Sequence, residues 1–282
     1  MDKKFDKLSE LTNDEAIDAI YDLCAKAMPE LNLKREPLKI DKVGDFGIVN
    51  PGPKKITKAL VKIDRKIRTK ADKRKKTPLC DIIDQRYANK EAQIFDKISD
   101  WTRFTVIIQD FKSAPFVIAY FLGKLGGNID IHDRVGYKGI HQHSIYKGIR
   151  FEVQFHTPLH AELKRATDPL YHEAEDLLTK AQRNALSEEI DQYCKVVYGR
   201  TDFNENLDAL QEVVDLYQSR EPSEEKQKLK YFTEVVSKSH LIQADLEEHL
   251  KDCLTELTKM SNTILLTKPR KNNTETIKDA GK

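Results

Sequence analysis

Residues 136–157 read GYKGIHQHSIYKGIRFEVQFHT, and this stretch predicts a β-hairpin. Between residues 140 and 146 the side chains alternate with the two-residue period of a strand. Lys147-Gly148 supplies a two-residue turn, after which residues 149–155 continue the extended pattern. On the second strand Glu152 and Gln154 share the polar face. A carboxylate in mid-strand is out of place in an apolar core, so we expect Glu152 to face a cleft.

The elements around the hairpin predict the fold class. Residues 103–108 form an apolar-leaning run typical of a central strand, and residues 128–131 begin a shorter one. Residues 29–53 predict an irregular connection. Apolar periodicity predicts helices at 14–28 (with Asn13 as the cap), 54–75, 79–98, 112–125 and from Pro158 to about residue 183. This order predicts an α/β (α+β) protein, a mixed sheet surrounded by helices.

The chain divides into four predicted parts. Residues 1–50 form a helical lead-in and residues 51–185 the sheet-containing domain. Residues 186–267 form a helical C-terminal appendage, with helices predicted at 187–198, 204–219 and 224–260. The polar tail, residues 268–282, predicts disorder.

Composition narrows the classes of protein. Of 282 residues, 33% are charged and 39% apolar, as in water-soluble helix-rich proteins. Because the net charge is only +2, affinity for polyanions must come from local patches. The sequence predicts neither a transmembrane span nor a signal peptide, and four scattered cysteines predict reduced thiols in a cytosol.

The hairpin motifs resemble the synthetase domain of the RelA/SpoT family, the enzymes that make alarmones of the (p)ppGpp type. Tyr137 and His141 match the family's tyrosine and histidine, and Glu152 with Gln154 matches its Glu-x-Gln pair. The sequences of these motifs resemble most a divergent branch of the family that is found in bacterial toxins and effectors.

Two further motifs precede the hairpin in the family's order. Asp100 and Arg103 resemble the aspartate and arginine at the entry to a buried strand. Residues 54–76 hold twelve Lys or Arg, and there Lys55, Lys58 and Lys62 resemble the basic helix that holds ATP phosphates. A charge run alone is more often a solvated helix face, so the phosphate prediction depends on the motifs downstream.

The resemblance implies an ATP pyrophosphokinase. Pyrophosphate would pass from ATP to the 3′-hydroxyl of an acceptor nucleotide, with Mg²⁺ held by Asp100 and Glu152. Arg103 would bind ATP with the three lysines, while Tyr137, His141 and Gln154 would bind the acceptor. Glu152 could also accept the proton of the attacking hydroxyl.

The partners implied are ATP and GDP, GTP, ADP or a second ATP, with the 3′ end of tRNA as an alternative acceptor. An antitoxin or immunity protein is a further expected partner, and a bacterial cytosol, including that of another cell, is the expected location. Two non-enzymatic hypotheses stay open. One is an inactive nucleotide-sensing or partner-binding relative, and the other is an RNA-binding module that uses residues 54–76.

Histidines raise two other hypotheses. His141, His143, His156 and His160 could bind zinc, but their spacing shows no carboxylate beside them, so a surface hairpin is the preferred interpretation. His132-Asp133 is similar to the paired ligands of alarmone hydrolases but lacks their helical context, so a hydrolase site is not expected.

Overall fold

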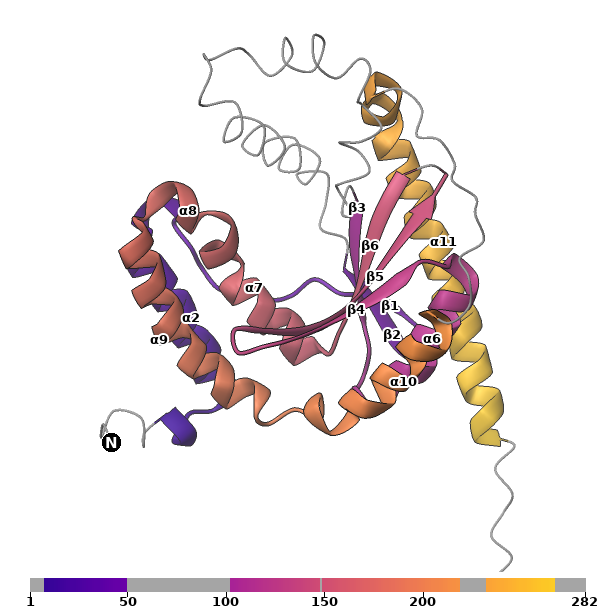
Figure 1. Ribbon diagram of the computed structural model, residues 1–282, viewed down its shortest axis with the longest axis horizontal. Helices are drawn as coiled ribbons and strands as arrows, with labels where there is room; N and C mark the ends of the chain where they lie inside the picture. Colours follow the sequence, from indigo (N-terminus) through magenta and orange to yellow (C-terminus); the bar gives the residue numbers. More distant parts are fainter. Residues whose placement is uncertain (1–7, 50–101, 148, 219–231, 267–282) are drawn as a thin grey trace, which may run out of the picture.

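The computed structural model describes residues 8–49, 102–147, 149–218 and 232–266 (Figure 1). Within them one mixed sheet has the strand order β1-β2-β3-β6-β5-β4. The strands are β1 (Asp41–Val43), β2 (Phe46–Val49), β3 (Thr102–Ile107), β4 (Asn128–Arg134), β5 (Tyr137–Tyr146) and β6 (Ile149–His156). The predicted helices at 54–75 and 79–98 and the predicted tail lie outside the described residues.

Helices lie on both sides of the sheet (Figure 1). They are α2 (Asn13–Ala27), α6 (Ala114–Leu125), α7 (Pro158–His172), α8 (Ala174–Leu177), α9 (Lys180–Tyr198), α10 (Leu207–Gln218) and α11 (Phe232–Leu266), with 3₁₀ turns at Leu8–Glu10, Pro29–Leu31 and Asn204–Asn206. The predicted fold class, a mixed sheet surrounded by helices, is therefore confirmed. No helix in the described part of the chain has the length and apolar character to cross a membrane.

The predicted hairpin is β5 and β6. Tyr146 pairs with Ile149 across the two-residue turn, and the antiparallel register runs on to Ile140 opposite Phe155. Lys147 takes φ +47°, a left-handed conformation that such tight turns need. The register fixes which side chains of the two strands lie side by side.

A parallel pairing places β3 beside β6. Arg103 lies in register with Glu152, although 49 positions of chain separate them. The connection from β3 to β6 runs through α6, β4 and β5, as a parallel pair requires a crossover. Two residues predicted for one site are thus neighbours in the centre of the sheet.

Each face of the sheet is covered by a different group of helices. Phe151, Val153 and Phe155 are buried toward α6, α10 and α11, and the Phe155 and Phe121 rings meet edge to face at 5.4 Å. Full burial of each such side chain stabilises the fold by about 1.5–3 kcal/mol. Helices α10 and α11 contribute to this same core, through residues such as Leu210 and Leu250.

A second core joins α2, α7 and α9. Helix α2 begins with a capping box. The Thr12 hydroxyl accepts a hydrogen bond from the backbone amide of Glu15, and the Glu15 carboxylate accepts one from the backbone amide of Thr12. The cap is Thr12 rather than Asn13, which is the first helical residue. Helix α7 also touches β3, β5 and β6, so this group of helices faces the polar side of the central strands.

Two predictions of local structure were wrong. Residues 29–53 contain β1 and β2, a hairpin around Gly44 at φ +60°, where we had expected an irregular connection. The single helix expected from Pro158 to residue 183 is three helices. The last of the three, α9, starts anew at Lys180 because Thr179 caps it with a capping box to Gln182.

Candidate active site

The polar face of β6 carries the buried carboxylate of Glu152, which is only 6% exposed. Strand alternation puts Phe151 and Val153 into the core and turns Glu152 and Gln154 to the other side, toward α7. A carboxylate at this depth must be compensated by neighbouring donors or charges. Arg103 from β3 and histidines from β5 provide them.

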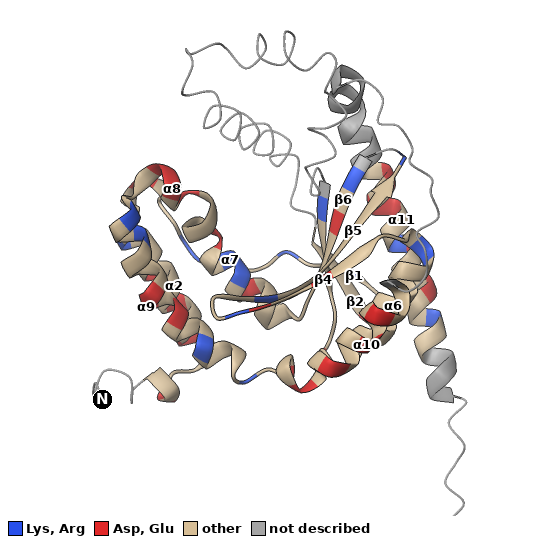
Figure 2. Ribbon diagram, in the orientation of Figure 1, with Lys and Arg blue, Asp and Glu red and all other residues tan. Residues whose placement is uncertain are grey.

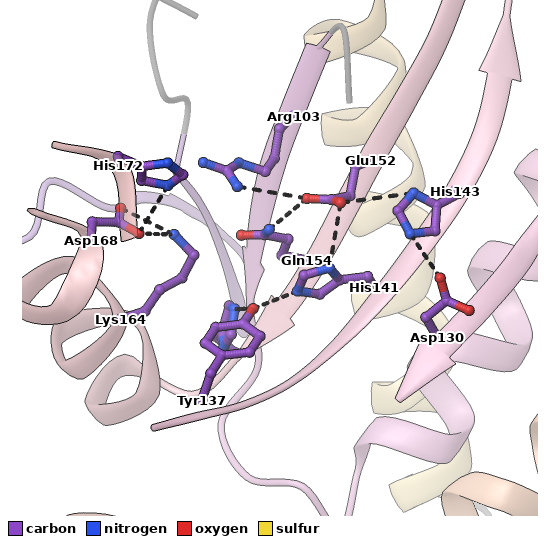
Figure 3. Close-up of polar contacts among 11 residues, drawn as sticks. Arg103, Asp130, Tyr137, His141, His143, Glu152, Gln154, Lys164, Asp168 and His172 are labelled. Carbon is purple, nitrogen blue, oxygen red and sulfur yellow. Dashed lines mark hydrogen bonds and ion pairs between the residues drawn. The ribbon is translucent and has the colours of Figure 1, made fainter. Parts of the chain in front are cut away.

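Each oxygen of Glu152 has its own neighbours (Figure 3). Oε1 accepts a hydrogen bond from Gln154 Nε2 and lies 3.9 Å from Arg103 Nη1. Oε2 lies 3.4 Å from His141 Nδ1 and 3.7 Å from His143 Nδ1. Four side chains from three strands therefore converge on one carboxylate.

These neighbours set the ionisation of Glu152. Burial by itself would raise the pKa of Glu152, but the hydrogen bond and charge of His141, with the charges of Arg103 and His143, lower it to about 2. At neutral pH Glu152 is an anion and a weak base. The surroundings of Glu152 therefore suit a fixed negative charge that holds neighbouring cations in place. They suit a proton acceptor less well.

Tyr137 extends the cluster along β5. Its hydroxyl lies between His141 Nε2, at hydrogen-bonding distance, and His156 Nε2 at 3.2 Å. Gly139 permits this approach, because a Cβ there would lie 2.7 Å from His156 Cε1 and 2.9 Å from the Tyr137 hydroxyl oxygen. The hydroxyl points inward, and the ring stays partly exposed beside His132.

His143 is held from its other side by Asp130 of β4. Asp130 Oδ2 lies 3.1 Å from His143 Nε2, while the buried Nδ1 makes no hydrogen bond within the described residues. Neither residue was predicted as part of the site around Glu152. The sequence does contain a signal for His143. A two-residue turn at 147–148 pairs residue 146 with 149, and counting back along both strands from that pair places His143 opposite Glu152.

A second polar group on α7 lies across from the strands (Figure 3). Lys164 Nζ pairs with Asp168 Oδ1 at 2.9 Å, and His172 Nε2 lies 3.6 Å from the same oxygen. Burial lowers the pKa of Lys164, and Asp168 opposes that shift. None of these three residues was predicted as a site residue, although their i, i+4 spacing after Pro158 indicates one face of a helix.

The predicted site residues fall into two sets. Arg103, Tyr137, His141, Glu152 and Gln154 come together in the cluster just described. The remaining predicted residues lie outside the described ones; they are Asp100, Lys55, Lys58 and Lys62.

The four histidines considered for zinc do not form one group. His156, the last residue of β6, and His160 in the first turn of α7 are fully buried, and burial lowers the pKa of both. His141 and His143 instead meet Glu152, and one ligand atom from each of these three residues lies within 4.8 Å of the other two. The carboxylate that the spacing did not reveal comes from the opposite strand.

This donor set is a poor match for magnesium. Mg²⁺ takes oxygen ligands in octahedral geometry, usually one or two carboxylates with water and phosphate oxygens. Among the described residues Glu152 has two imidazoles and a guanidinium around it, and no second carboxylate contacts it. Imidazole nitrogens suit zinc and related transition metals instead.

Comparisons with known proteins add similarities of fold. No family model and no curated protein sequence matches the chain. It is similar to a GTP pyrophosphokinase family protein from Streptococcus pneumoniae, at a TM-score of 0.33 and 14% identity over 77% of this chain and 99% of that one. It is also similar to a chain of the complex between the Type VI effector Tas1 and its immunity protein, at a TM-score of 0.29 and 20% identity over 54% of this chain and 98% of that one. At these scores the argument for function rests on the chain's own residues.

Proposed function

We propose that this protein is a pyrophosphokinase that transfers the β,γ-pyrophosphate of ATP to the 3′-hydroxyl of a second nucleotide. One observation carries the proposal. The five described residues that resemble the RelA/SpoT synthetase motifs are spread from position 103 to position 154 and form one cluster around Glu152. Arg103, His141 and Gln154 contact Glu152 directly, and Tyr137 contacts His141. Linear motifs without a common function have no reason to converge on one buried carboxylate.

Arg103 is the proposed ligand of the ATP phosphates. Its guanidinium is 14% exposed and points toward the side of the site where Lys164 lies (Figure 3). Glu152 Oε1 lies 3.9 Å from Nη1 of Arg103, and the other edge of the planar guanidinium is the one proposed to bind phosphate oxygens. Lys55, Lys58 and Lys62 are proposed to complete the phosphate site.

Tyr137 and His141 are proposed to bind the acceptor nucleotide. The partly exposed ring of Tyr137 is held by its two histidine contacts and could stack on a base. Gln154, bonded to Glu152, would fix the carboxylate's orientation. Acceptors in the proposal are GDP, GTP, ADP and ATP, with the tRNA 3′ end as the alternative.

In the proposed reaction the acceptor's 3′ oxygen attacks the β-phosphorus of ATP. The bond between that phosphorus and the α,β-bridging oxygen breaks, AMP leaves, and the hydroxyl proton is released. Such transfers have loose transition states in which positioning and charge neutralisation supply most of the catalysis. Arg103, with Glu152 holding it, fits that requirement without a strong base. Mg²⁺ on Asp100 and Glu152 stays part of the expectation from the resemblance, but no step here depends on it.

The two other hypotheses make different demands on the chain. The RNA-binding hypothesis needs clustered positive charge and places it at residues 54–76, which lie outside the described residues; over the described helices both signs of charge are distributed (Figure 2). A nucleotide-binding relative without activity would keep ATP binding and show no transfer.

The test is an incubation of the purified protein with labelled ATP, divalent cations and each acceptor in turn. We expect AMP and one pyrophosphorylated acceptor. Arg103→Met should lower the rate by at least about 100-fold, because it removes a preorganised cation from the transferring phosphates. Arg165→Met is the matched control, since Arg165 lies on the α7 surface and binds Glu36. ATP binding without AMP release would support the inactive relative, and an immunity partner would be sought only if expression of the active protein proves toxic.

A further inference from the structure

We propose that His141, His143 and Glu152 bind a single divalent transition metal of the zinc class. Oε2 of Glu152 faces the Nδ1 atoms of both histidines, at 3.4 Å and 3.7 Å (Figure 3). Ligands bound at 2.0–2.1 Å around a tetrahedral ion lie about 3.3 Å apart, so both separations need little change. One ligand atom from each of the three residues lies within 4.8 Å of the other two, so rotation of the imidazole rings would bring all three to the distances of a tetrahedral site.

The contact with Asp130 orients His143 so that its Nδ1 atom faces Glu152. As a metal ligand His143 is neutral, and because Asp130 can only accept a hydrogen bond, the proton of the ring then lies on Nε2, 3.1 Å from Asp130 Oδ2. The lone pair of Nδ1 then points at an ionised carboxylate, and within the described part of the chain this buried atom makes no hydrogen bond. This Nδ1 atom and Glu152 Oε2 are 3.7 Å apart, so a cation between them would be bound by both. A carboxylate behind a histidine is also the usual outer support of a metal ligand.

His141 has a matching support in Tyr137. The phenol oxygen can accept the proton of His141 Nε2 and donate its own to His156 Nε2 at 3.2 Å. In that arrangement the Nδ1 lone pair of His141 also faces Glu152.

The ligand set specifies the metal and its role. Two imidazoles and one carboxylate suit zinc, cobalt, nickel or iron and not magnesium. Three protein ligands leave a fourth position for water or a phosphate oxygen, as in catalytic zinc sites. That position lies in the same polar cluster as Arg103, where the proposed function puts the ATP phosphates. The inference concerns that site, but it is measured by metal binding and can fail or hold without the proposed activity.

The probe is Co²⁺, whose visible absorption reports coordination number. The full-length protein is treated with chelator and titrated with CoCl₂. We expect saturation at one ion per chain, intense bands of a four-coordinate ion, displacement by equimolar Zn²⁺ and no displacement by millimolar Mg²⁺.

Variants distinguish this site from adventitious surface binding. His143→Ala should abolish the four-coordinate spectrum, and Asp130→Ala should weaken binding about 10- to 100-fold by removing the outer support. Asp130 is half-exposed, so its variant does not put folding at risk. His249→Ala is the matched control, because that ring stacks on Tyr146 and contacts none of the three ligands. Absence of saturable binding, an unchanged spectrum in His143→Ala, or equal competition by Mg²⁺ would overturn the proposal.

Discussion

His160 should make the protein sensitive to mild acid. Its side chain is fully buried between the rings of Phe111 and Tyr198, with centroids 4.7 and 4.8 Å away, and its Nε2 lies 3.1 Å from the Thr201 hydroxyl. Burial lowers the pKa of His160 from 6.5 to about 3, with the nearby charge of Lys138 acting in the same direction. The folded protein therefore keeps this imidazole neutral, whereas the unfolded chain protonates it.

The sign of the effect follows from that difference. With a folded-state pKa below the unfolded value, stability is fully present above pH 6.5 and is lost as the pH falls toward 3. Between pH 7 and pH 5 the linkage relation gives a loss of about 2 kcal/mol from His160 alone. Because burial also lowers the pKa of His156 well below its usual value, the intact protein should lose more than this single contribution.

The assay is urea unfolding at several pH values between 5 and 7, followed by circular dichroism. His160→Gln removes one titrating group, so its loss of stability between pH 7 and pH 5 should be smaller than that of the wild type by about 2 kcal/mol. His249→Gln is the control for removal of a histidine outside the core, and it should keep the wild-type dependence. If the His160→Gln curve runs parallel to the wild type within about 0.5 kcal/mol, the imidazole is not buried in its neutral form and the reasoning is wrong.

Two further substitutions test the supports of the site and of the core. Gly139→Ala should destabilise the protein by about 1–3 kcal/mol in urea unfolding. The added Cβ would lie 2.7 Å from His156 Cε1 and displace Tyr137. A variant as stable as the wild type would contradict this close packing. Asp202→Ala should cost about 2 kcal/mol in the same assay, since Asp202 Oδ2 accepts the backbone amides of residues 111 and 112, both at 3.0 Å. Asp202→Asn, which keeps an acceptor oxygen, should lose less, and equal losses for the two variants would show that the charge rather than the acceptor matters.

The sequence predicted the parts of the fold that have strong local signals. The hairpin at 137–156 and helix α6 followed from periodicity, since a two-residue turn and an apolar stripe each specify one structure. Strands β1 and β2 were missed because three or four residues are too few for a period to be detected. Val43 and Phe46 pair around Gly44-Asp45, and that dipeptide was the only local sign of the hairpin.

The candidate site could be predicted only for the residues that belong to the sequence motifs. Glu152 was singled out because a carboxylate in mid-strand is unusual, and the structure places it at the centre of the cluster. The parallel pairing that brings Arg103 to it depends on the whole sheet and has no local signal. Lys164 and Asp168 were missed for the same reason, since only the packing of α7 against the strands turns their face toward the site.

The most direct test of the central claim compares AMP release by the wild-type protein and by Glu152→Gln, with ATP and the full panel of acceptors. Gln keeps the size of the side chain but removes the charge that holds Arg103 and His141. Glu256→Gln is the matched control, because that carboxylate is exposed and binds Lys124 on the other face of the sheet. The account predicts AMP with a pyrophosphorylated acceptor for the wild type and the control, and a rate at least about 100-fold lower for Glu152→Gln. Equal AMP release by Glu152→Gln and the wild type would contradict it.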